Sequence, residues 1–196
     1  MRFDRMAAVK YAWRYAISYN DNYPYFSYLG GDCTNFVSQV MHAGGWPMIP
    51  GARTGDPLAW WAHPHPGSSN DLGLINRKLS HTRTWTSVGD FYDHLESSKR
   101  CELCHRDELD LGDIVQMREF GAKHPHHTMV VTNKACGYYG DEVYVSYHSL
   151  DKLDVPLAEI EENEKYADNL FICWKVKDII PHVEALDFEP EISLTY

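Results

Sequence analysis

The spacing of apolar residues changes its period about halfway along the chain, and this change restricts the fold class. In the first half, apolar residues recur every three or four positions over residues 5–20 and 33–43, which is the period of an amphipathic helix. In the second half, short runs rich in β-branched and aromatic residues alternate with turn residues, as strands do. Helices followed by strands predict an α+β domain with an antiparallel sheet.

Four segments of the second half are predicted strands: Asp113–Arg118, Thr128–Thr132, Val143–His148 and Phe171–Val176. Gly137 to Gly140 lies between the second and third, where a hairpin connection is expected. Two more helices are predicted over Val88–Leu95 and, as a solvated segment, over Glu159–Glu164. Residues 46–75 are rich in Pro, Gly, Ser and Trp, which indicates a long ordered loop.

The size and composition favour a single domain over residues 1–183, followed by an acidic tail over 184–196. Hydrophobic residues make up 44% of the 196 residues, enough for a sizeable core. We expect at least two of the loop tryptophans to lie in that core. Trp60 and Trp61 cannot both face inward if the chain is extended there, because successive side chains alternate.

The formal net charge of −10 excludes some partners. An acidic surface repels phosphate backbones and anionic lipid, so we expect no nucleic-acid partner. There is no run of about 18 apolar residues, so we expect no membrane span. Residues 1–5 lead directly into a helical pattern without the apolar core of a signal peptide, which makes a cytoplasmic protein the default expectation and a trimmed chain the alternative.

Five cysteines cannot all pair within one chain, so reduced thiols are expected. The run from Cys101 to His105 has the Cys-x-x-Cys-His spacing of c-type haem attachment, but nothing indicates export. A zinc site would need two further ligands, for example His105 or Cys136, and a second Cys-x-x-Cys pair is absent. We therefore interpret this run as an exposed loop.

Cys33 is a candidate nucleophile because it stands where a helix begins, after Gly30-Gly31-Asp32. Asp32 is expected to cap this helix. Unpaired backbone N–H groups and the helix dipole stabilise a thiolate there, which predicts a lowered cysteine pKa. The same amides can stabilise an oxyanion. The alternative is a buried cysteine that only packs.

A thiolate nucleophile needs a base, and His127 opens the predicted strand over Thr128–Thr132. His148 ends the next strand. If these strands pair as a hairpin, the start of one lies beside the end of the other, so the two histidines meet at one edge of the sheet. His124 and His126 compete with His127 as the base.

The segment from Gly30 to Gln39 resembles the signature of a bacterial family of putative amidase domains and, more distantly, the cysteine motif of NlpC-type cell-wall peptidases. Further blocks resemble the same family in the same order: Ala8–Ala12, Asn22–Phe26, Ala43–Gly45, Leu111–Val115, His127–Thr132 and Tyr147–Asp151.

This resemblance implies a papain-like fold in which a cysteine-bearing helix packs on an antiparallel sheet. It carries over Cys33 as nucleophile, His127 as base and His148 as the third, polar residue. Thr128 departs from the family, in which serine commonly follows the base.

Together these patterns predict a cysteine amidase or peptidase that cleaves an amide through a thioester, without metal or organic cofactor. His148 or Asp151 would fix the tautomer of His127, and Tyr28 is a candidate oxyanion donor. The expected partner is a peptide or amide, with peptidoglycan-derived peptides as the leading class by analogy. The alternatives are an acyl transferase with the same dyad, a binding module of the same fold, and a metal or redox protein centred on Cys101 and Cys104.

Overall fold

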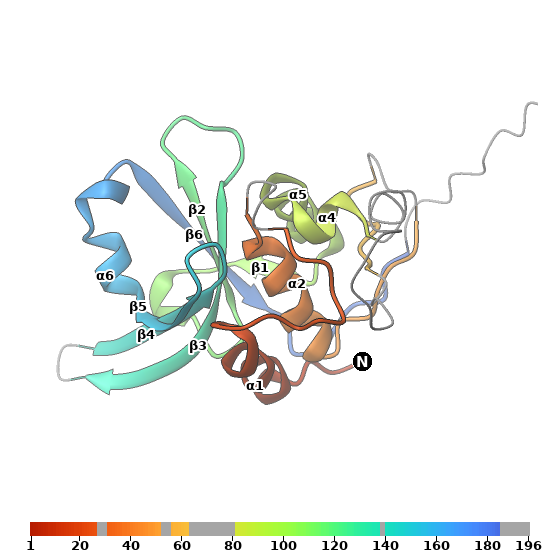
Figure 1. Cartoon of the computed structure of the whole chain (residues 1–196), viewed down its shortest axis with the longest axis horizontal. Coiled ribbons are helices and arrows are strands. Elements are labelled where there is room, and N and C mark those ends of the chain that lie inside the picture. Colours follow the sequence, from red (N-terminus) through yellow and green to blue (C-terminus); the bar gives the residue numbers. More distant parts are fainter. Residues whose placement is uncertain (27–30, 52–55, 63–80, 138–139, 185–196) are drawn as a thin grey trace, which may run out of the picture.

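The protein has an α+β fold in which one antiparallel sheet separates two layers of helices (Figure 1). A computed structural model describes residues 1–26, 31–51, 56–62, 81–137 and 140–184. Tyr28, part of the loop predicted over 46–75 and almost all of the predicted tail lie outside the described residues. The papain-like assignment stays a prediction.

The helices are α1 (Arg5–Tyr15), α2 (Cys33–Ala43), α4 (Arg83–Thr86), α5 (Val88–Ser98) and α6 (Leu157–Glu161), with short 3-10 turns at Arg106–Glu108 and Glu164–Tyr166. The strands are β1 (Cys101–Leu103), β2 (Ile114–Glu119), β3 (His127–Gly137), β4 (Gly140–Tyr147), β5 (Lys152–Pro156) and β6 (Asn169–Val176). They lie in the order β1-β6-β2-β3-β4-β5, and every neighbouring pair is antiparallel. The four predicted strands and the β3–β4 hairpin are confirmed.

The helix predicted over 33–43 is confirmed with the same bounds. The first helix is shorter than predicted and ends at Tyr15. Its buried residues are Ala8, Val9 and Ala12, while Met6 and Trp13 are 44% and 42% exposed. Small alanine side chains let α1 approach α2 closely, and this leaves the larger apolar residues outside.

The two faces of the sheet bury separate cores. Helices α1, α2, α4 and α5 cover one face, and α6 covers the other (Figure 1). Alternation along β3 puts Val130 in the core beneath α2 and puts Met129 and Val131 in the core on the α6 side. The opposite faces of β3 therefore belong to different environments, which matters for His127 and Thr128 below.

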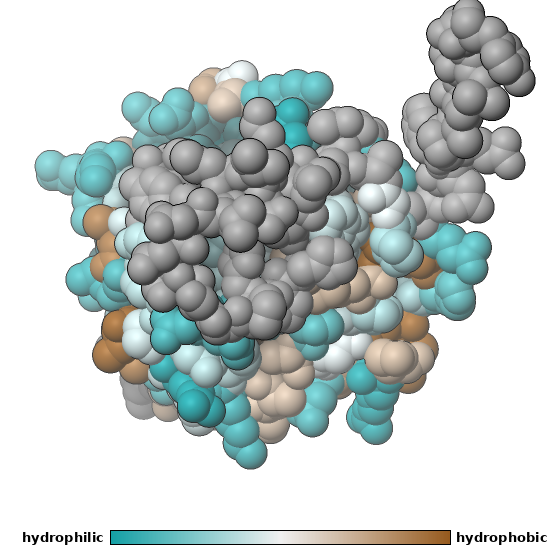
Figure 2. All heavy atoms as spheres, turned by 45° about the vertical axis from the view of Figure 1, so that its right-hand side comes forward, coloured by the Kyte–Doolittle hydropathy of each residue, from teal (hydrophilic) through white to brown (hydrophobic). Residues whose placement is uncertain are grey.

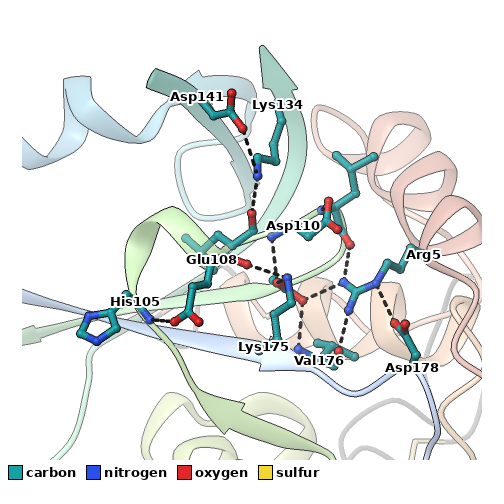
Figure 3. A network of polar contacts seen from close by, with 12 residues as sticks. Arg5, His105, Glu108, Asp110, Lys134, Asp141, Lys175, Val176 and Asp178 are labelled. Carbon is teal, nitrogen blue, oxygen red and sulfur yellow. Dashed lines mark hydrogen bonds and ion pairs between the residues drawn. The ribbon is translucent and has the colours of Figure 1, made fainter. Parts of the chain in front are cut away.

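A buried carboxylate fastens α1 to the sheet (Figure 3). Arg5 Nη1 donates to Asp113 Oδ1 at 2.7 Å, and Lys175 Nζ lies 3.2 Å from the other oxygen. The backbone N–H groups of Asp110 and Val176 also donate to this carboxylate. Burial lowers the pKa of Arg5, but hydrogen bonding and attraction to Asp113 and Asp178 outweigh it, so the pKa is raised. The network fixes the position of α1, and through it that of α2, relative to the sheet.

Three tryptophans, Trp46, Trp60 and Trp85, lie in the helix-side core, as expected for at least two. The interpretation of the Cys101–His105 run as an exposed loop was wrong. Cys101 is buried in strand β1 in the helix-side core, whereas the half-buried Cys104 packs against the core on the α6 side. Since the two thiols lie on opposite faces, they are poorly placed to share one metal ion.

Figure 2 turns the right-hand side of Figure 1 forward and shows hydrophilic residues intermixed with small hydrophobic groups around the described part of that face. In the described residues, no helix has the length and apolar character needed to cross a membrane.

Candidate active site

Cys33 is the first residue of α2 and is only 5% exposed. Its Sγ lies 3.9 Å from Thr34 Oγ1. Burial raises the pKa of Cys33, and the negative charge of Asp32 adds to this, while hydrogen bonds from the Thr128 backbone and from Thr34 oppose it. This differs from the lowered pKa predicted from the helix start, because sequence position reveals the helix terminus but not the depth of burial.

The turn before Cys33 is built against the end of β4. Gly31 has φ +134°, and a Cβ atom there would lie 3.0 Å from Ser149 Oγ, so a glycine fits both the backbone conformation and the contact. The backbone N–H of Asp32 donates to the same Ser149 Oγ at 3.0 Å. The residues after β4 therefore fix the approach of the chain to Cys33.

Asp32 occupies the N-cap position, but its side chain does not cap α2 as predicted. Its carboxylate turns away from the helix start. Oδ1 accepts hydrogen bonds from the Phe26 backbone N–H and from Asn35 Nδ2, both at 2.9 Å. Oδ2 lies 2.7 Å from His148 Nδ1. A long-range partner, which sequence alone does not reveal, has replaced the local cap.

His127 is the first residue of β3, and its ring packs edge-to-face on Tyr147 with centroids 4.9 Å apart. Burial, together with the neighbouring His126, lowers the pKa of His127 to about 4. Within the described part of the chain, neither ring nitrogen has a hydrogen-bond partner. The imidazole is therefore neutral at ordinary pH and free to accept a proton.

Thr128 connects the nucleophile candidate to the base candidate. A hydrogen bond from its backbone opposes the rise in the pKa of Cys33, and its Oγ1 lies 3.3 Å from Thr34 Oγ1. Gln116 Nε2 donates to the same hydroxyl at 3.2 Å. Cys33 thus lies over the helix-side face at the residue that follows His127. No hydrogen bond joins Cys33 Sγ to the His127 ring among the residues described.

The other predicted residues lie elsewhere. His148 is 2% exposed and has Tyr15 O at 2.7 Å from Nε2, so both of its nitrogens are occupied away from His127. Asp151 accepts a hydrogen bond from Tyr19 Oη. His124 lies 3.5 Å from Asp93. Neither His148 nor Asp151 is hydrogen-bonded to His127, so their role as its orienting partner stays a prediction.

A cavity of about 350 Å³ lies on the α6 side, beside His127. Most of its lining is apolar or aromatic, with a few polar groups at the rim: Met117, Glu119, His126, His127, Met129, Tyr147, Ser149, Leu150, Ile160, Lys165, Tyr166 and Asn169. Because Ser149 also contacts the turn before Cys33, the cavity is bounded on that side by the nucleophile loop. Sequence reasoning had not identified Ser149, Tyr147 or Thr128 as parts of this site.

Nothing in the described residues forms a group of three or more His, Cys, Asp or Glu side chains that could hold a metal ion.

The comparisons with known proteins agree with the resemblance found in the sequence. The model of the family described as "Putative amidase domain" matches residues 2–171. The chain is 32% identical to the uncharacterized protein YjcM of Bacillus subtilis over 163 residues, covering 81% of this chain and 34% of that protein. It is 29% identical over 140 residues to the uncharacterized protein YhbB of the same organism, covering 69% of this chain and 39% of that protein. The chain thus spans little more than a third of the length of these relatives. No solved structure matches.

Proposed function

Since this chain belongs to the family of putative amidase domains, we propose that it hydrolyses an amide bond through a thioester on Cys33, with His127 as the base. The observation that carries this proposal is the arrangement around Thr128. A hydrogen bond from its backbone opposes the rise in the pKa of Cys33, and the adjacent residue, His127, lines a cavity with an imidazole that has no hydrogen bond among the described residues. Thioester chemistry requires a nucleophile and a base within hydrogen-bond reach of each other, and the adjacency of Thr128 and His127 brings the two candidates to the same end of β3.

The reaction starts from a neutral pair. Burial raises the pKa of Cys33 and lowers that of His127 to about 4, so the resting site holds a thiol and a neutral imidazole rather than an ion pair. The thiol proton moves to His127 as Sγ bonds to the carbonyl carbon. Apo sites often lack the catalytic hydrogen bond, which forms when substrate binds.

Collapse of the tetrahedral species breaks the C–N bond, and His127 gives the proton to the departing amine. The acyl group remains on Sγ as a thioester. Water then attacks this thioester, again with His127 accepting the proton. The C–S bond breaks, the proton returns to the sulfur, and a carboxylic acid leaves. Backbone N–H groups at the start of α2 are the proposed donors to the oxyanion.

The cavity supports an amide substrate with an apolar side chain next to the scissile bond. Its walls are formed largely by methionine, tyrosine and isoleucine side chains, with Lys165 and Glu119 supplying charge. Pockets of this size and composition bind apolar groups and use a few polar groups for orientation. Cell-wall peptides are a reasonable first class to test, because the cysteine motif is similar to that of NlpC-type peptidases.

One observation favours a second candidate, a binding module that uses the same cavity without catalysis: the Cys33 thiol is only 5% exposed. The two functions differ in their dependence on sulfur. A binding module keeps its affinity for an amide ligand in a Cys33→Ala variant and releases no amine with either protein.

The test is amine release from a panel of short peptides and peptidoglycan fragments by the wild-type chain, Cys33→Ala and Cys104→Ala. We expect release by wild type and Cys104→Ala and none by Cys33→Ala. Cys104 is the matched control because it is a free cysteine packed against the other core. Turnover that survives in Cys33→Ala would refute the proposal. Adding an acceptor amine separates hydrolysis from acyl transfer by the products formed.

A further inference from the structure

We propose that His148 is a positioning residue for the nucleophile, a doubly protonated imidazolium that ties Asp32 and α1 together behind Cys33. This rests on the proposed function in one respect, that Cys33 is the reacting group. It gives His148 a different role from the orienting partner of His127 that the sequence predicted.

The hydrogen-bond partners of His148 determine its protonation state. Nδ1 lies 2.7 Å from Asp32 Oδ2, and Nε2 lies 2.7 Å from the backbone oxygen of Tyr15. A backbone oxygen can only accept, and so can an ionised carboxylate. A neutral imidazole has one N–H and can satisfy only one of the two. With Asp32 ionised, both contacts are hydrogen bonds only when each ring nitrogen carries a proton.

Asp32 is suited to be the counter-ion. Its Oδ1 already accepts from Phe26 N–H and Asn35 Nδ2, so with His148 the carboxylate receives three donors. Hydrogen bonds to a carboxylate favour its charged form. Both side chains are nearly inaccessible, at 3% for His148 and 1% for Asp32. A buried charge persists only when it is paired and hydrogen-bonded in this way.

Two aromatic rings pack against the imidazolium. Phe36 of α2 stacks at 4.2 Å between ring centroids, and Tyr19 lies at 4.5 Å. Ring faces attract cations, most strongly where water is excluded. Tyr19 in turn donates to the carboxylate of Asp151.

The contacts of His148 with Asp32 and Tyr15 form a clamp, and this clamp acts on the residue before Cys33. His148 links the Asp32 side chain to α1, while Ser149 Oγ accepts a hydrogen bond from the Asp32 backbone N–H. Two consecutive residues after β4 thus hold both the side chain and the backbone of Asp32. Their immediate neighbour Tyr147 points to the other face and packs on His127. One short segment therefore supports the nucleophile on one face of the sheet and the base on the other.

His94 provides a matched control within the same chain. It is also buried, and its Nδ1 lies 2.7 Å from a backbone oxygen, that of Pro57. Its Nε2, however, has no hydrogen-bond partner among the residues that the structure describes. Burial and the charge of Arg100 lower the pKa of His94 to about 3, although the hydrogen bond to Pro57 opposes them. His94 therefore has one N–H where we assign two to His148.

The experiment is ¹⁵N–¹H correlation of the histidine side chains in the full-length wild-type chain at neutral pH. His148 is assigned through its contacts with Phe36 and Tyr19 ring protons, so no variant is needed. We expect the shifts of two protonated nitrogens for His148 and of one protonated and one unprotonated nitrogen for His94. An unprotonated nitrogen in His148 would overturn the assignment, whether or not the chain proves to be an amidase.

The positioning role is tested by the rate of iodoacetamide labelling at Cys33, mapped by mass spectrometry. Releasing the turn exposes the thiol, so we expect labelling several-fold faster in His148→Gln and Asp32→Asn but unchanged in His94→Gln, with folding checked by near-UV circular dichroism. Unchanged labelling in folded His148→Gln would contradict the role. A role in folding alone predicts equal effects of His148→Gln and His94→Gln. If labelling follows our expectation but no amide is cleaved, the proposed function fails and the clamp remains.

Discussion

The two faces of the sheet treat neighbouring residues of β3 differently. On the helix side, Thr128 is fully buried and joined to Thr34 and Gln116, and the nearby His148 has partners at both nitrogens. On the α6 side, the His127 ring has an aromatic neighbour and a cavity, and no hydrogen bond among the described residues.

This difference indicates a division of labour across one sheet edge. The helix-side face fixes the nucleophile through a closed set of hydrogen bonds. The α6-side face leaves the ring of the base without a hydrogen bond among the described residues, beside a cavity. Alternation along a strand makes this possible, because adjacent residues serve opposite faces while their backbones stay together.

The largest effect on activity is expected on the α6 side of the sheet, where His127 lies beside the cavity. His127→Ala should reduce amine release on the order of 10⁴-fold, because the residue that moves the proton is lost. His148→Ala should reduce it less, since a positioning residue acts only through Asp32. His126→Ala is the matched control, being the adjacent histidine on the same cavity. Near-normal turnover in His127→Ala together with an inactive His126→Ala would show that His126, not His127, is the base.

On the helix side of the sheet, the expected effect is on the free energy of unfolding. Asp32→Ala leaves a buried imidazolium without its counter-ion, and breaking a buried pair in this way costs about 3–5 kcal/mol. Asp178→Ala is the control, because it removes a partner of Arg5 that is 59% exposed, and exposed pairs contribute at most about 1 kcal/mol. Urea unfolding measures both. Equal losses would show that the buried pair of Asp32 and His148 contributes no more to stability than the exposed pair of Asp178 and Arg5.

These expectations also show what the sequence could predict. Gly30-Gly31-Asp32 precedes α2 and Gly44-Gly45 follows it, so the bounds of this helix were predictable. Runs rich in β-branched residues indicated four of the strands. Strands β1 and β5 are too short to show alternation. The burial that raises the pKa of Cys33 and the partner that diverts Asp32 from capping both come from long-range packing. The positions of Cys33, His127 and His148 could therefore be predicted, but not the protonation states that their surroundings impose.

The pH dependence separates a neutral resting pair from an ion pair. His127 must be unprotonated to act as the base, and burial lowers its pKa to about 4. The value of kcat/KM should therefore stay level on going below the ordinary histidine pKa of about 6.5 and fall only as pH drops through about 4. A fall in kcat/KM near the ordinary histidine pKa, in a protein that remains folded, would contradict the buried environment assigned to His127.

The smallest effect is expected at the mouth of the cavity. Leu150 lines it and is 61% exposed, so Leu150→Asp should leave folding intact while it disfavours an apolar substrate. We expect kcat/KM for the most apolar amide to fall about tenfold, the scale of one apolar contact. Leu103→Asp is the control, because Leu103 is 64% exposed and lies on β1, outside the cavity lining. Equal effects of the two substitutions would argue that substrate binds elsewhere.

The most direct test of the account is to trap the acyl-enzyme. Wild-type protein is mixed with the best amide of the panel, quenched in acid within one turnover, digested and mapped by mass spectrometry. The account predicts that the peptide containing Cys33 gains the mass of the acyl group, that hydroxylamine removes this mass, and that the same peptide gains nothing in Cys33→Ala. Amine release by wild type with no acyl group on Cys33, and undiminished release by Cys33→Ala, would contradict it.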